Sequence, residues 1–321
     1  MDDGSTYLLN EYDNAEGDLA PVRWQEWCPA PTGIHFTDEQ QRAIHTAARG
    51  LNVFLTGAAG TGKSLVLRHI VRVLKMQHGR EKVYVTASTG CAARHVGGVT
   101  IHTALNLGTM PDRECVKTSL ARIVSKPNSY EKWSRLSAIV IDEVSMLSSV
   151  FWDKLDTLAR AIRSNIHTPW GGIQVIAVGD FLQLGPVGAQ ARWAFQGTFW
   201  KLTKFRNCLL TKVHRQASSS LVDRLGELRE GRITEEVLAF VEANEVDTAD
   251  ATSTVLMSHN VGVDKVNTSK LLALGKTRKL HRYVEYVEGK AACCSLYCRC
   301  EDILVQVQTR QADHTGTTCK S

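Results

Sequence analysis

The stretch GAAGTGKS, residues 57–64, fits the pattern Gly-x-x-x-x-Gly-Lys-Ser/Thr of a phosphate-binding loop. A short apolar segment, LNVFLTG (51–57), precedes it, and LVLRHIVRVLKMQHG (65–79) follows with apolar residues at helical spacing. The loop therefore lies between an expected strand and an expected helix, which is the context in which this pattern binds nucleotide phosphates. The alternative is a chance glycine-rich turn, which does not predict those flanking elements.

In such a loop the glycines let backbone N–H groups surround a triphosphate, and the following helix adds its positive end. Lys63 is expected to reach the β and γ phosphates, and the Ser64 hydroxyl is expected to bind magnesium. ATP and magnesium are therefore the expected cofactors. The nucleotide contacts predicted along the loop are Gly57, Ala58, Ala59, Gly60, Thr61, Gly62, Lys63 and Ser64.

Three further apolar runs predict strands of the same sheet, namely KVYVTAS (82–88), SAIVIDE (137–143) and GGIQVIAVGD (171–180). The last two runs are nearly continuous in apolar residues and end in carboxylates, which is typical of strands buried on both faces in a parallel sheet. A helix is predicted in SVFWDKLDTLARAIRS (149–164), between the last two strands. Strands that alternate with helices predict an α/β domain.

A capped helix is predicted upstream of the loop, in FTDEQQRAIHTAARG (36–50). Thr37 is the expected N-cap, and Gln40 stands three residues later, which is capping-box spacing. Gly50 is expected to end the helix.

Two carboxylates follow the strand IVIDE (139–143). Asp142 can hold magnesium directly or through water, and Glu143 can act as the general base on the attacking water. An ordinary acidic turn after a strand is the alternative. The position of the pair downstream of a phosphate loop, in a parallel-sheet pattern, favours the catalytic interpretation.

Two more residues are candidates for contacts with the terminal phosphate. Gln183, in VGDFLQL (178–184), is placed to sense the γ phosphate or to position water, with Asp180 fixing the loop. A surface turn residue explains Gln183 equally well. Arg215, in VHRQ (213–216), is placed to stabilise charge on the transferred phosphoryl group. A solvated arginine at an element boundary is the alternative for Arg215.

The net charge of +5 favours polyanionic partners only weakly. No uncharged apolar run approaches the roughly 20 residues that span a bilayer, so we expect no membrane span. The first 20 residues contain six acidic residues and no basic one, unlike a secretory signal or a mitochondrial presequence. We therefore expect an intracellular protein.

The second half of the chain predicts two helices in 219–244, a strand in TSTVLMSHN (252–260) and a helix in 261–275. These elements predict the opening of a second α/β unit, whose pattern fades after Arg282. The spacing in CCSLYCRC (293–300) favours a Cys-rich tail of no fixed structure over a zinc site. The predicted domains are a flexible extension (1–32), the ATPase domain (33–207), the start of a second domain (208–282) and an unassigned tail (283–321).

Six segments closely resemble, in order and spacing, the PIF (petite integration frequency) family of DNA helicases, in the RecD-like branch of superfamily one. The resemblance extends from Phe36 to about Leu274. The pattern GDFLQL after DEVSM, and TASTGCAA before it, are not general features of phosphate-loop proteins. The segments are FTDEQQ (36–41), GAAGTGKS (57–64), VTASTGCAARHVGGVTIHT (85–103), IVIDEVSML (139–147), GGIQVIAVGDFLQLGPV (171–187) and LTKVHRQ (210–216).

The resemblance implies a RecA-like P-loop NTPase domain followed by a partial second RecA-like domain. It also implies a 5′-to-3′ DNA helicase that couples ATP hydrolysis to stepping along single-stranded DNA. Single-stranded DNA and DNA junctions are the implied partners. DNA repair, recombination and telomere maintenance are the implied processes, in the nucleus or the mitochondrion. No pattern in the chain predicts an oligomeric state.

The resemblance also implies roles for individual residues. The ATP-site residues that match the family are the adenine reader Gln40, the phosphate and magnesium ligands Lys63 and Ser64, the magnesium-binding Asp142, the base Glu143, the γ-phosphate sensor Gln183 and the arginine finger Arg215. The DNA-contacting positions are Thr86, Thr89, Gly90, His102, His259 and Asn260. Hydroxyl, backbone and basic groups of this kind grip DNA phosphates without reading sequence. Capping of sheet loops is the alternative for these polar residues.

Two later family motifs do not occur in the sequence, a Thr-Ile-His-Lys-x-Gln-Gly type run and a Tyr-Val-Ala-x-Ser-Arg type run with a second arginine finger. The second domain is therefore expected to be cut short. The alternative function is a truncated ATP- and DNA-binding module that does not unwind. A phosphate-loop ATPase acting on protein is a third hypothesis, which the DNA-groove segment disfavours. Gly185 stands where the family usually has proline, which we expect to loosen its loop.

Overall fold

The structure, a computed structural model, describes residues 23–108, 114–188, 191–214, 219–245, 256–257, 259–275, 280–287, 290–298 and 303–304. The chain divides into two compact units, Met1–Ala243 and Asn244–Ser321. The domain boundaries that the sequence suggests, after residues 32, 207 and 282, remain predictions.

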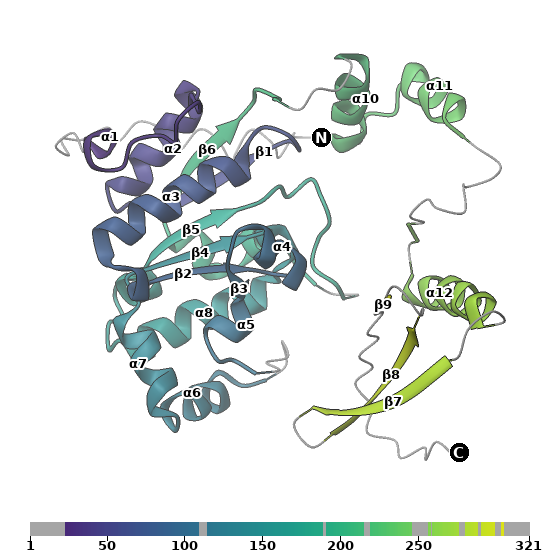
Figure 1. Cartoon of the computed structure of the whole chain (residues 1–321). Coiled ribbons are helices and arrows are strands. Elements are labelled where there is room, and N and C mark those ends of the chain that lie inside the picture. Colours follow the sequence, from purple (N-terminus) through teal and green to yellow (C-terminus); the bar gives the residue numbers. More distant parts are fainter. Residues whose placement is uncertain are drawn as a thin grey trace. The chain divides into compact units, whose positions relative to one another are not determined.

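A six-stranded parallel sheet forms the centre of the first unit (Figure 1). The strand order is β3-β2-β4-β5-β1-β6. The predicted α/β fold is therefore confirmed. Because β4, β5 and β1 are neighbours, the loops after their carboxyl ends meet at one edge of the sheet. The strands are β1 (Val53–Gly57), β2 (Val83–Ala87), β3 (Val99–Thr100), β4 (Ala138–Asp142), β5 (Gln174–Val178) and β6 (Arg206–Leu210).

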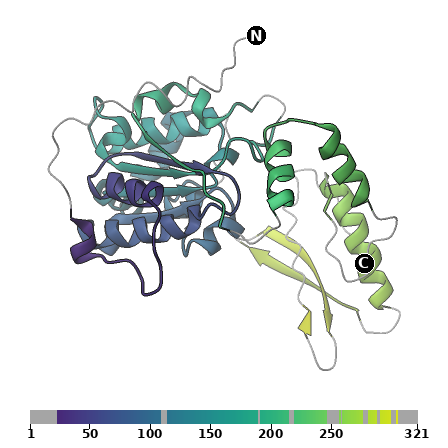
Figure 2. The same ribbon diagram turned by 90° about the horizontal axis from the view of Figure 1, so that it is seen from above.

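Helices cover both faces of this sheet. Successive residues of a strand point to opposite faces, so each strand contributes side chains to both cores. In β4, Ala138 and Val140 join the core cluster on the face of α2 (Asp38–Ala48) and α3 (Lys63–His78), whereas Ile139 and Ile141 join the cluster that contains α8 (Ser149–Ile162). Figure 2 shows these layers from above, with the purple and blue helices α2 and α3 on one side of the strands. The continuous apolar runs of the sequence reflect this double burial.

Helix α2 begins as the sequence predicts. Thr37 Oγ1 accepts a hydrogen bond from the Gln40 backbone N–H (3.3 Å), and Gln40 Oε1 accepts one from the Thr37 N–H (3.1 Å). The predicted helices α3 and α8 are also confirmed. The remaining helices and the edge strand β6 are not predicted by the sequence; the helices of about one turn have too few residues to define a period. The other helices up to β6 are α1 (Trp24–Trp27), η2 (Arg80–Lys82), α4 (Gly90–His95), α5 (Ile101–Ala104), α6 (Val116–Val124), α7 (Pro127–Arg135), η3 (Val144–Met146), η4 (Pro169–Gly172), η5 (Ala194–Gln196) and α9 (Thr198–Leu202).

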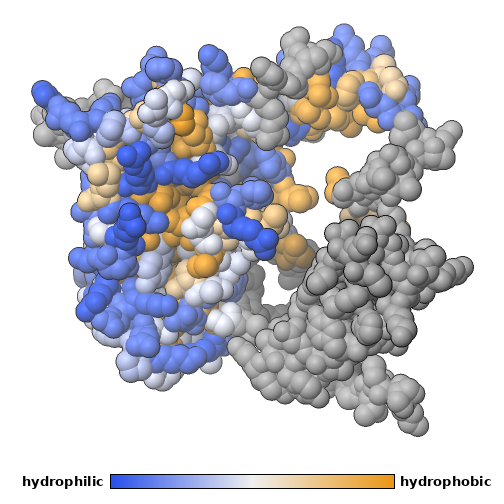
Figure 3. Space-filling view, viewed as in Figure 1, coloured by the Kyte–Doolittle hydropathy of each residue, from blue (hydrophilic) through white to orange (hydrophobic). Residues whose placement is uncertain are grey.

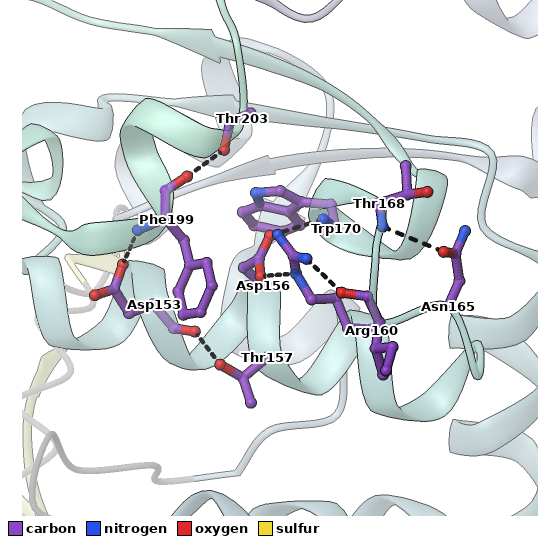
Figure 4. A network of polar contacts seen from close by, with 10 residues as sticks. Asp153, Asp156, Thr157, Arg160, Asn165, Thr168, Trp170, Phe199 and Thr203 are labelled. Atoms are coloured by element: carbon purple, nitrogen blue, oxygen red, sulfur yellow. Dashed lines mark hydrogen bonds and ion pairs between the residues drawn. The ribbon is translucent and has the colours of Figure 1, made fainter.

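A buried polar network fixes the connection from α8 to β5 (Figure 4). Asp156 is fully buried and accepts hydrogen bonds from Arg160 Nε and from the Trp170 backbone N–H, the latter at 2.7 Å. Arg160 also donates to the Ile166 carbonyl (2.6 Å) and lies 5.1 Å from the centre of the Phe199 ring. The network holds Trp170 in a left-handed backbone conformation (φ 53°) just before β5.

We predict that Asp156→Ala lowers the free energy of unfolding by about 3 kcal/mol, because it leaves a partly buried guanidinium and a buried backbone N–H without their acceptor. Urea denaturation checks this value. The matched control is Glu131→Ala, which breaks the exposed pair Glu131–Arg135 on α7. That variant is expected to cost less than about 1 kcal/mol. Equal losses in the two variants would contradict a structural role for the network.

Beyond the sheet, α10 (Ser219–Arg229) and α11 (Glu235–Ala243) confirm the two predicted helices. They pack on one another, and Arg224 of α10 binds Glu227 (2.9 Å) and Glu236 of α11 (2.6 Å). Orange surface gathers over these two helices at the upper right of Figure 3. The pair therefore presents apolar surface as well as its charged groups; the exposed apolar side chains are Leu225, Leu228, Leu238 and Val241.

The second unit contains α12 (Asn260–Gly275), which confirms the predicted helix there, and an antiparallel sheet in the order β7-β8-β9. Most of the predicted strand 252–260 lies outside the described residues. The prediction of a tail without fixed structure is wrong where the sheet occurs. Its strands lack clear polar–apolar alternation, and pairing from Leu280 with Tyr297 to Val287 with Lys290 supplies the backbone partners. The strands are β7 (Leu280–Val287), β8 (Lys290–Cys298) and β9 (Ile303–Leu304).

Across the described part of the chain, every helix is too short or too polar to cross a membrane.

Candidate nucleotide-phosphate site

The loop 57–62 leaves the end of β1 in a conformation that its first glycine permits. Gly57 has φ +147°, and a Cβ placed there would lie 2.4 Å from the Leu210 carbonyl oxygen of β6. Any other residue would therefore push the loop away from the sheet. Helix α3 then starts from Gly62 with no side-chain cap and no acidic residue in its first turn. Its first N–H groups and its positive end are thus left for an anion.

Lys63 lies at the centre of this loop. Its ammonium donates hydrogen bonds to the carbonyl oxygens of Gly57 (2.6 Å) and Ala58 (3.0 Å). Burial lowers the pKa of Lys63, and the negative charges of Asp180, Glu143 and Asp142 oppose that shift. A bound phosphate would offer the ammonium a charged acceptor in place of two neutral carbonyls, which is a stronger hydrogen bond.

Gln40 is buried against the same loop. Its Nε2 donates to the Thr61 carbonyl (3.3 Å), while its Oε1 accepts from Thr37. One hydrogen and one lone pair of the amide stay free of these two bonds. Gln40 therefore ties the start of α2 to the phosphate loop, and its amide retains the capacity for a further partner.

The predicted carboxylates stand at the end of β4. Burial raises the pKa of Asp142 to about 6, and the Glu143 backbone N–H donates to its Oδ1 at 2.9 Å. Glu143 has left-handed backbone angles (φ 53°, ψ 46°), which are uncommon for a residue with a side chain. Such strain is stored mostly at functional sites, where the surrounding structure holds it.

Asp180 follows β5 and organises the loop that carries Gln183. Its side chain is 2% exposed. Oδ1 accepts from the Leu182 N–H (3.1 Å), and Oδ2 accepts from Gln183 Nε2 (3.1 Å). Arg229, the last residue of α10, donates from Nε to Oδ2 (2.6 Å) and from Nη2 to Oδ1 (2.8 Å). Burial raises the pKa of Asp180, but the hydrogen bonds from Arg229, Leu182 and Gln183, together with the charge of Arg229, outweigh burial and hold the pKa below its ordinary value.

Sequence reasoning missed Arg229, since a single arginine at the end of an amphipathic helix has no signal that separates it from a solvated one. Arg215 lies outside the described residues. Its neighbour His214 donates its backbone N–H to the Gly60 carbonyl (2.9 Å), so the chain reaches the phosphate loop directly before Arg215. Thr211 is tied to Glu39 of α2 by two hydrogen bonds of 2.9 and 2.6 Å.

Two predicted DNA contacts follow β2. Thr86 is fully buried and its hydroxyl donates to the Val140 carbonyl (2.7 Å), so its assignment as a direct DNA contact is wrong. The sequence pattern does not predict the burial of Thr86, because a polar side chain can be buried in a sheet when its hydroxyl has a hydrogen-bond acceptor there. Thr89 caps α4, with Oγ1 accepting from Ala92 N–H (3.2 Å), and Gly90 is exposed. The Ser88 N–H donates to the Asp142 carbonyl (3.2 Å) and links this segment to β4.

The remaining predicted DNA contacts are His102, His259 and Asn260. His102 of α5 is half-buried and stacks on Phe151 of α8, with ring centres 4.8 Å apart, and burial lowers its pKa. His259 is exposed at the start of α12, where its carbonyl accepts the backbone N–H groups of Gly262 and Val263. Asn260 is the first residue of that helix. His259 and Asn260 belong to the second unit.

The loop after Gln183 departs from the expectation that Gly185 loosens it. A Cβ at Gly185 would lie 2.8 Å from the Trp193 ring. The glycine therefore lets the backbone pack closely on an indole ring, which restrains the loop. Leu182, Leu184 and Val187 of this loop are exposed.

Comparisons with known proteins match most of this chain. The family model for PIF1-like helicases matches residues 35–236. The ATP-dependent DNA helicase PIF1 of Danio rerio is 36% identical over 263 residues, which are 79% of this chain and 40% of that protein. The crystal structure of the Pif1 helicase from Candida albicans has a TM-score of 0.70 and 31% identity, covering 78% of this chain and 57% of that one.

A further solved structure, Bacteroides Pif1 bound to single-stranded DNA, has a TM-score of 0.64 and 25% identity, covering 83% of this chain and 64% of that one. This chain thus spans less than two thirds of the length of each of these three proteins.

Proposed function

The chain belongs to the PIF1-like helicase family, and from that premise we propose that it is an ATP-dependent DNA helicase that moves 5′ to 3′ on single-stranded DNA. The observation that carries the proposal is the convergence of Lys63, Asp142 and Gln183 after three neighbouring strands. A phosphate cradle, an acidic pair and a polar sensor are the parts that hydrolysis of a nucleoside triphosphate requires.

Each residue has a distinct task in the proposed hydrolysis. Lys63 leaves its loop carbonyls to neutralise the β and γ phosphates, and the N–H groups at the start of α3 bind the same anion. Glu143 takes a proton from the attacking water. Gln183 contacts the γ phosphate, and Arg215 stabilises charge that develops on the transferred group. Gln40 uses the free capacity of its amide to read adenine.

Magnesium fits the donors present, because the Ser64 hydroxyl and the Asp142 carboxylate supply the oxygen ligands that it prefers. When bound, magnesium neutralises charge on the β and γ phosphate oxygens. Asp142 binds the cation only when its carboxyl is deprotonated.

We predict that affinity for magnesium–ATP falls as the pH falls through about 6, because Asp142 then becomes protonated. The expected loss is about tenfold for each unit below that pKa. Titrations of magnesium–nucleotide binding across this range check it. Asp142→Asn is the control, since its affinity should be lower at high pH and should not follow this titration. An unchanged pH profile in the asparagine variant would assign the effect to another group.

Single-stranded DNA is proposed to lie along Thr89 and Gly90, on the end of β2 and the start of α4. Arg94 of α4 and the exposed Gly90 backbone suit phosphate contacts without base recognition. The bond from Ser88 to the Asp142 carbonyl connects that segment to the hydrolysis site. His102, His259 and Asn260 are proposed as further contacts. The DNA-bound Bacteroides relative supports DNA as the partner.

DNA repair, recombination and telomere maintenance are the processes we propose, with DNA junctions as substrates and the nucleus or mitochondrion as the site of action. The alternative of a binding module that does not unwind is less favoured, because the described hydrolysis residues are all present and lie together.

The test is steady-state ATP hydrolysis by the full chain with and without single-stranded DNA, followed by strand displacement on duplexes with a 5′ or a 3′ tail. The helicase proposal expects DNA-stimulated hydrolysis and displacement only from the 5′ tail. Stimulated hydrolysis without displacement from either tail would favour the binding module. Stimulation by protein partners and none by DNA would favour the third hypothesis, an ATPase that acts on protein.

A further inference from the structure

Arg229 is a residue of the site to which neither the motifs nor the family resemblance assigns a role. It reaches Asp180 from α10, 49 positions along the chain, and makes two hydrogen bonds with separate carboxylate oxygens, at 2.6 and 2.8 Å. Paired bonds of this kind are the strongest and most directional that arginine forms with a carboxylate. The side chain of Arg229 is 23% exposed and that of Asp180 is 2% exposed, so water screens the pair little.

Asp180 is a buried negative charge close to another cation that the site needs. Of the charges that raise the pKa of Lys63 against the effect of burial, Asp180 is the strongest. Without Arg229, the hydrogen bonds left to the Asp180 carboxylate come from Leu182 N–H and Gln183 Nε2, both uncharged. A buried carboxylate in that position attracts the nearest mobile cation. Lys63 would then be held by Asp180 and would be less available to a phosphate.

Gln183 has a related conflict. Its Nε2 donates to Asp180 Oδ2, which is the oxygen that also accepts from Arg229 Nε. One hydrogen of this amide group is donated to Asp180, so Gln183 can offer a γ phosphate its second hydrogen, and it gives up the bond to Asp180 when it turns to offer both. Arg229 keeps Asp180 bonded on both oxygens while Gln183 moves, so the move leaves no buried acceptor unsatisfied. Without Arg229, the same move would leave Oδ2 without a donor among these groups.

We propose that Arg229 is a positioning residue for γ-phosphate recognition, which neutralises Asp180 and thereby leaves Lys63 and Gln183 free for the terminal phosphate. The inference rests on the proposed ATPase function. It also gives α10 a direct connection to the phosphate-sensing loop, because the residue that frees the sensor belongs to that helix.

The test compares the dissociation constants of magnesium–ATPγS and magnesium–ADP for the full chain carrying Arg229→Met. ATPγS has the terminal phosphate that Gln183 contacts, and ADP does not. We expect the preference for ATPγS over ADP to fall at least about tenfold, the effect of losing a hydrogen bond to a charged group. A residue that only supports the fold would weaken both nucleotides equally and leave this ratio unchanged.

Three further variants complete the test. Asp180→Asn/Arg229→Met removes both charges and is expected to restore the ratio to within about threefold of wild type, since a neutral amide neither captures Lys63 nor retains Gln183. Arg229→Lys keeps the charge but not the paired geometry, and is expected to fall between wild type and Arg229→Met. Arg224→Met is the matched control, because Arg224 lies on the same helix, is 22% exposed and pairs with Glu227 and Glu236 instead. Its ratio should equal that of wild type.

An unchanged ratio in Arg229→Met, or a double variant no better than the single one, would overturn the inference. If Arg229→Met does not fold, the inference would be overturned by an Arg229→Lys variant whose preference for ATPγS over ADP equals that of wild type. Wild-type protein that binds neither nucleotide would overturn the proposed ATPase function together with the inference. Normal wild-type binding with an unchanged Arg229→Met ratio would overturn the inference alone.

Discussion

Lys63→Ala is expected to abolish ATP binding and turnover. The Lys63 ammonium lies inside the phosphate loop, held by the Gly57 and Ala58 carbonyls, and it is the group that would neutralise the β and γ phosphates. Removing one preorganised uncharged donor from the site of developing charge costs about 10²–10³-fold in turnover, and Lys63 adds a full positive charge. Because Lys63 also contributes to ground-state binding of the nucleotide, we expect at least the upper end of that range for kcat/KM.

The measurement is steady-state ATP hydrolysis with saturating single-stranded DNA, together with direct nucleotide binding. Lys75→Ala is the matched control, because Lys75 belongs to the last turn of the same helix, α3. That variant should hydrolyse ATP at the wild-type rate. Wild-type hydrolysis by Lys63→Ala would mean that the triphosphate binds elsewhere, and the whole assignment of the loop would be wrong.

Glu143→Gln should separate binding from chemistry. The glutamine has nearly the same shape and can adopt the same backbone, but it cannot take a proton from water. We expect magnesium–ATP affinity within about threefold of wild type and turnover lower by about 10²–10⁴-fold, the usual contribution of a positioned general base. The structure supports this role because the surrounding loop holds Glu143 in left-handed backbone angles beside Asp142.

Single-turnover hydrolysis and ATPγS binding, both measured on one protein preparation, check the Glu143 prediction. Glu131→Gln is the control, since Glu131 lies on α7 in an exposed ion pair with Arg135. Turnover close to wild type in Glu143→Gln would show that another group activates water. A loss of affinity as large as the loss of turnover would instead assign Glu143 to nucleotide binding.

Much of the fold was predictable because local rules determined it. The capping box at Thr37 and Gln40 needs only residues three apart, and the structure contains both of its hydrogen bonds. The strands around Val140 and Ile176 are almost entirely apolar because both faces of a parallel sheet are covered. The paired helices α10 and α11 were also predictable from a local rule, because each repeats its apolar residues at helical spacing.

The errors came from properties that no local pattern carries. Thr86 has a hydroxyl of the kind that binds DNA phosphates, but Thr86 lies in β2, where this hydroxyl donates a hydrogen bond to the Val140 carbonyl. The strand β8 has no clear alternation, and its eight-residue pairing with β7 depends on a partner strand. Gly185 was expected to loosen a loop, but the position of Trp193 makes it a close-packing residue. Each case depends on which side chain or backbone comes near.

The sequence by itself determined that a phosphate loop stands between a strand and a helix, that carboxylates follow a later strand, and which family the chain belongs to. These features are local, because a loop, a cap or a buried strand is specified by neighbouring residues. Only the tertiary structure decided that Arg229 pairs with Asp180, and that the Ser88 N–H bonds to the Asp142 carbonyl. The physical reason is that neighbouring parallel strands bring their carboxyl ends together whatever their separation along the chain. Charged side chains carried on the loops after those strands can then pair with groups that are distant in sequence.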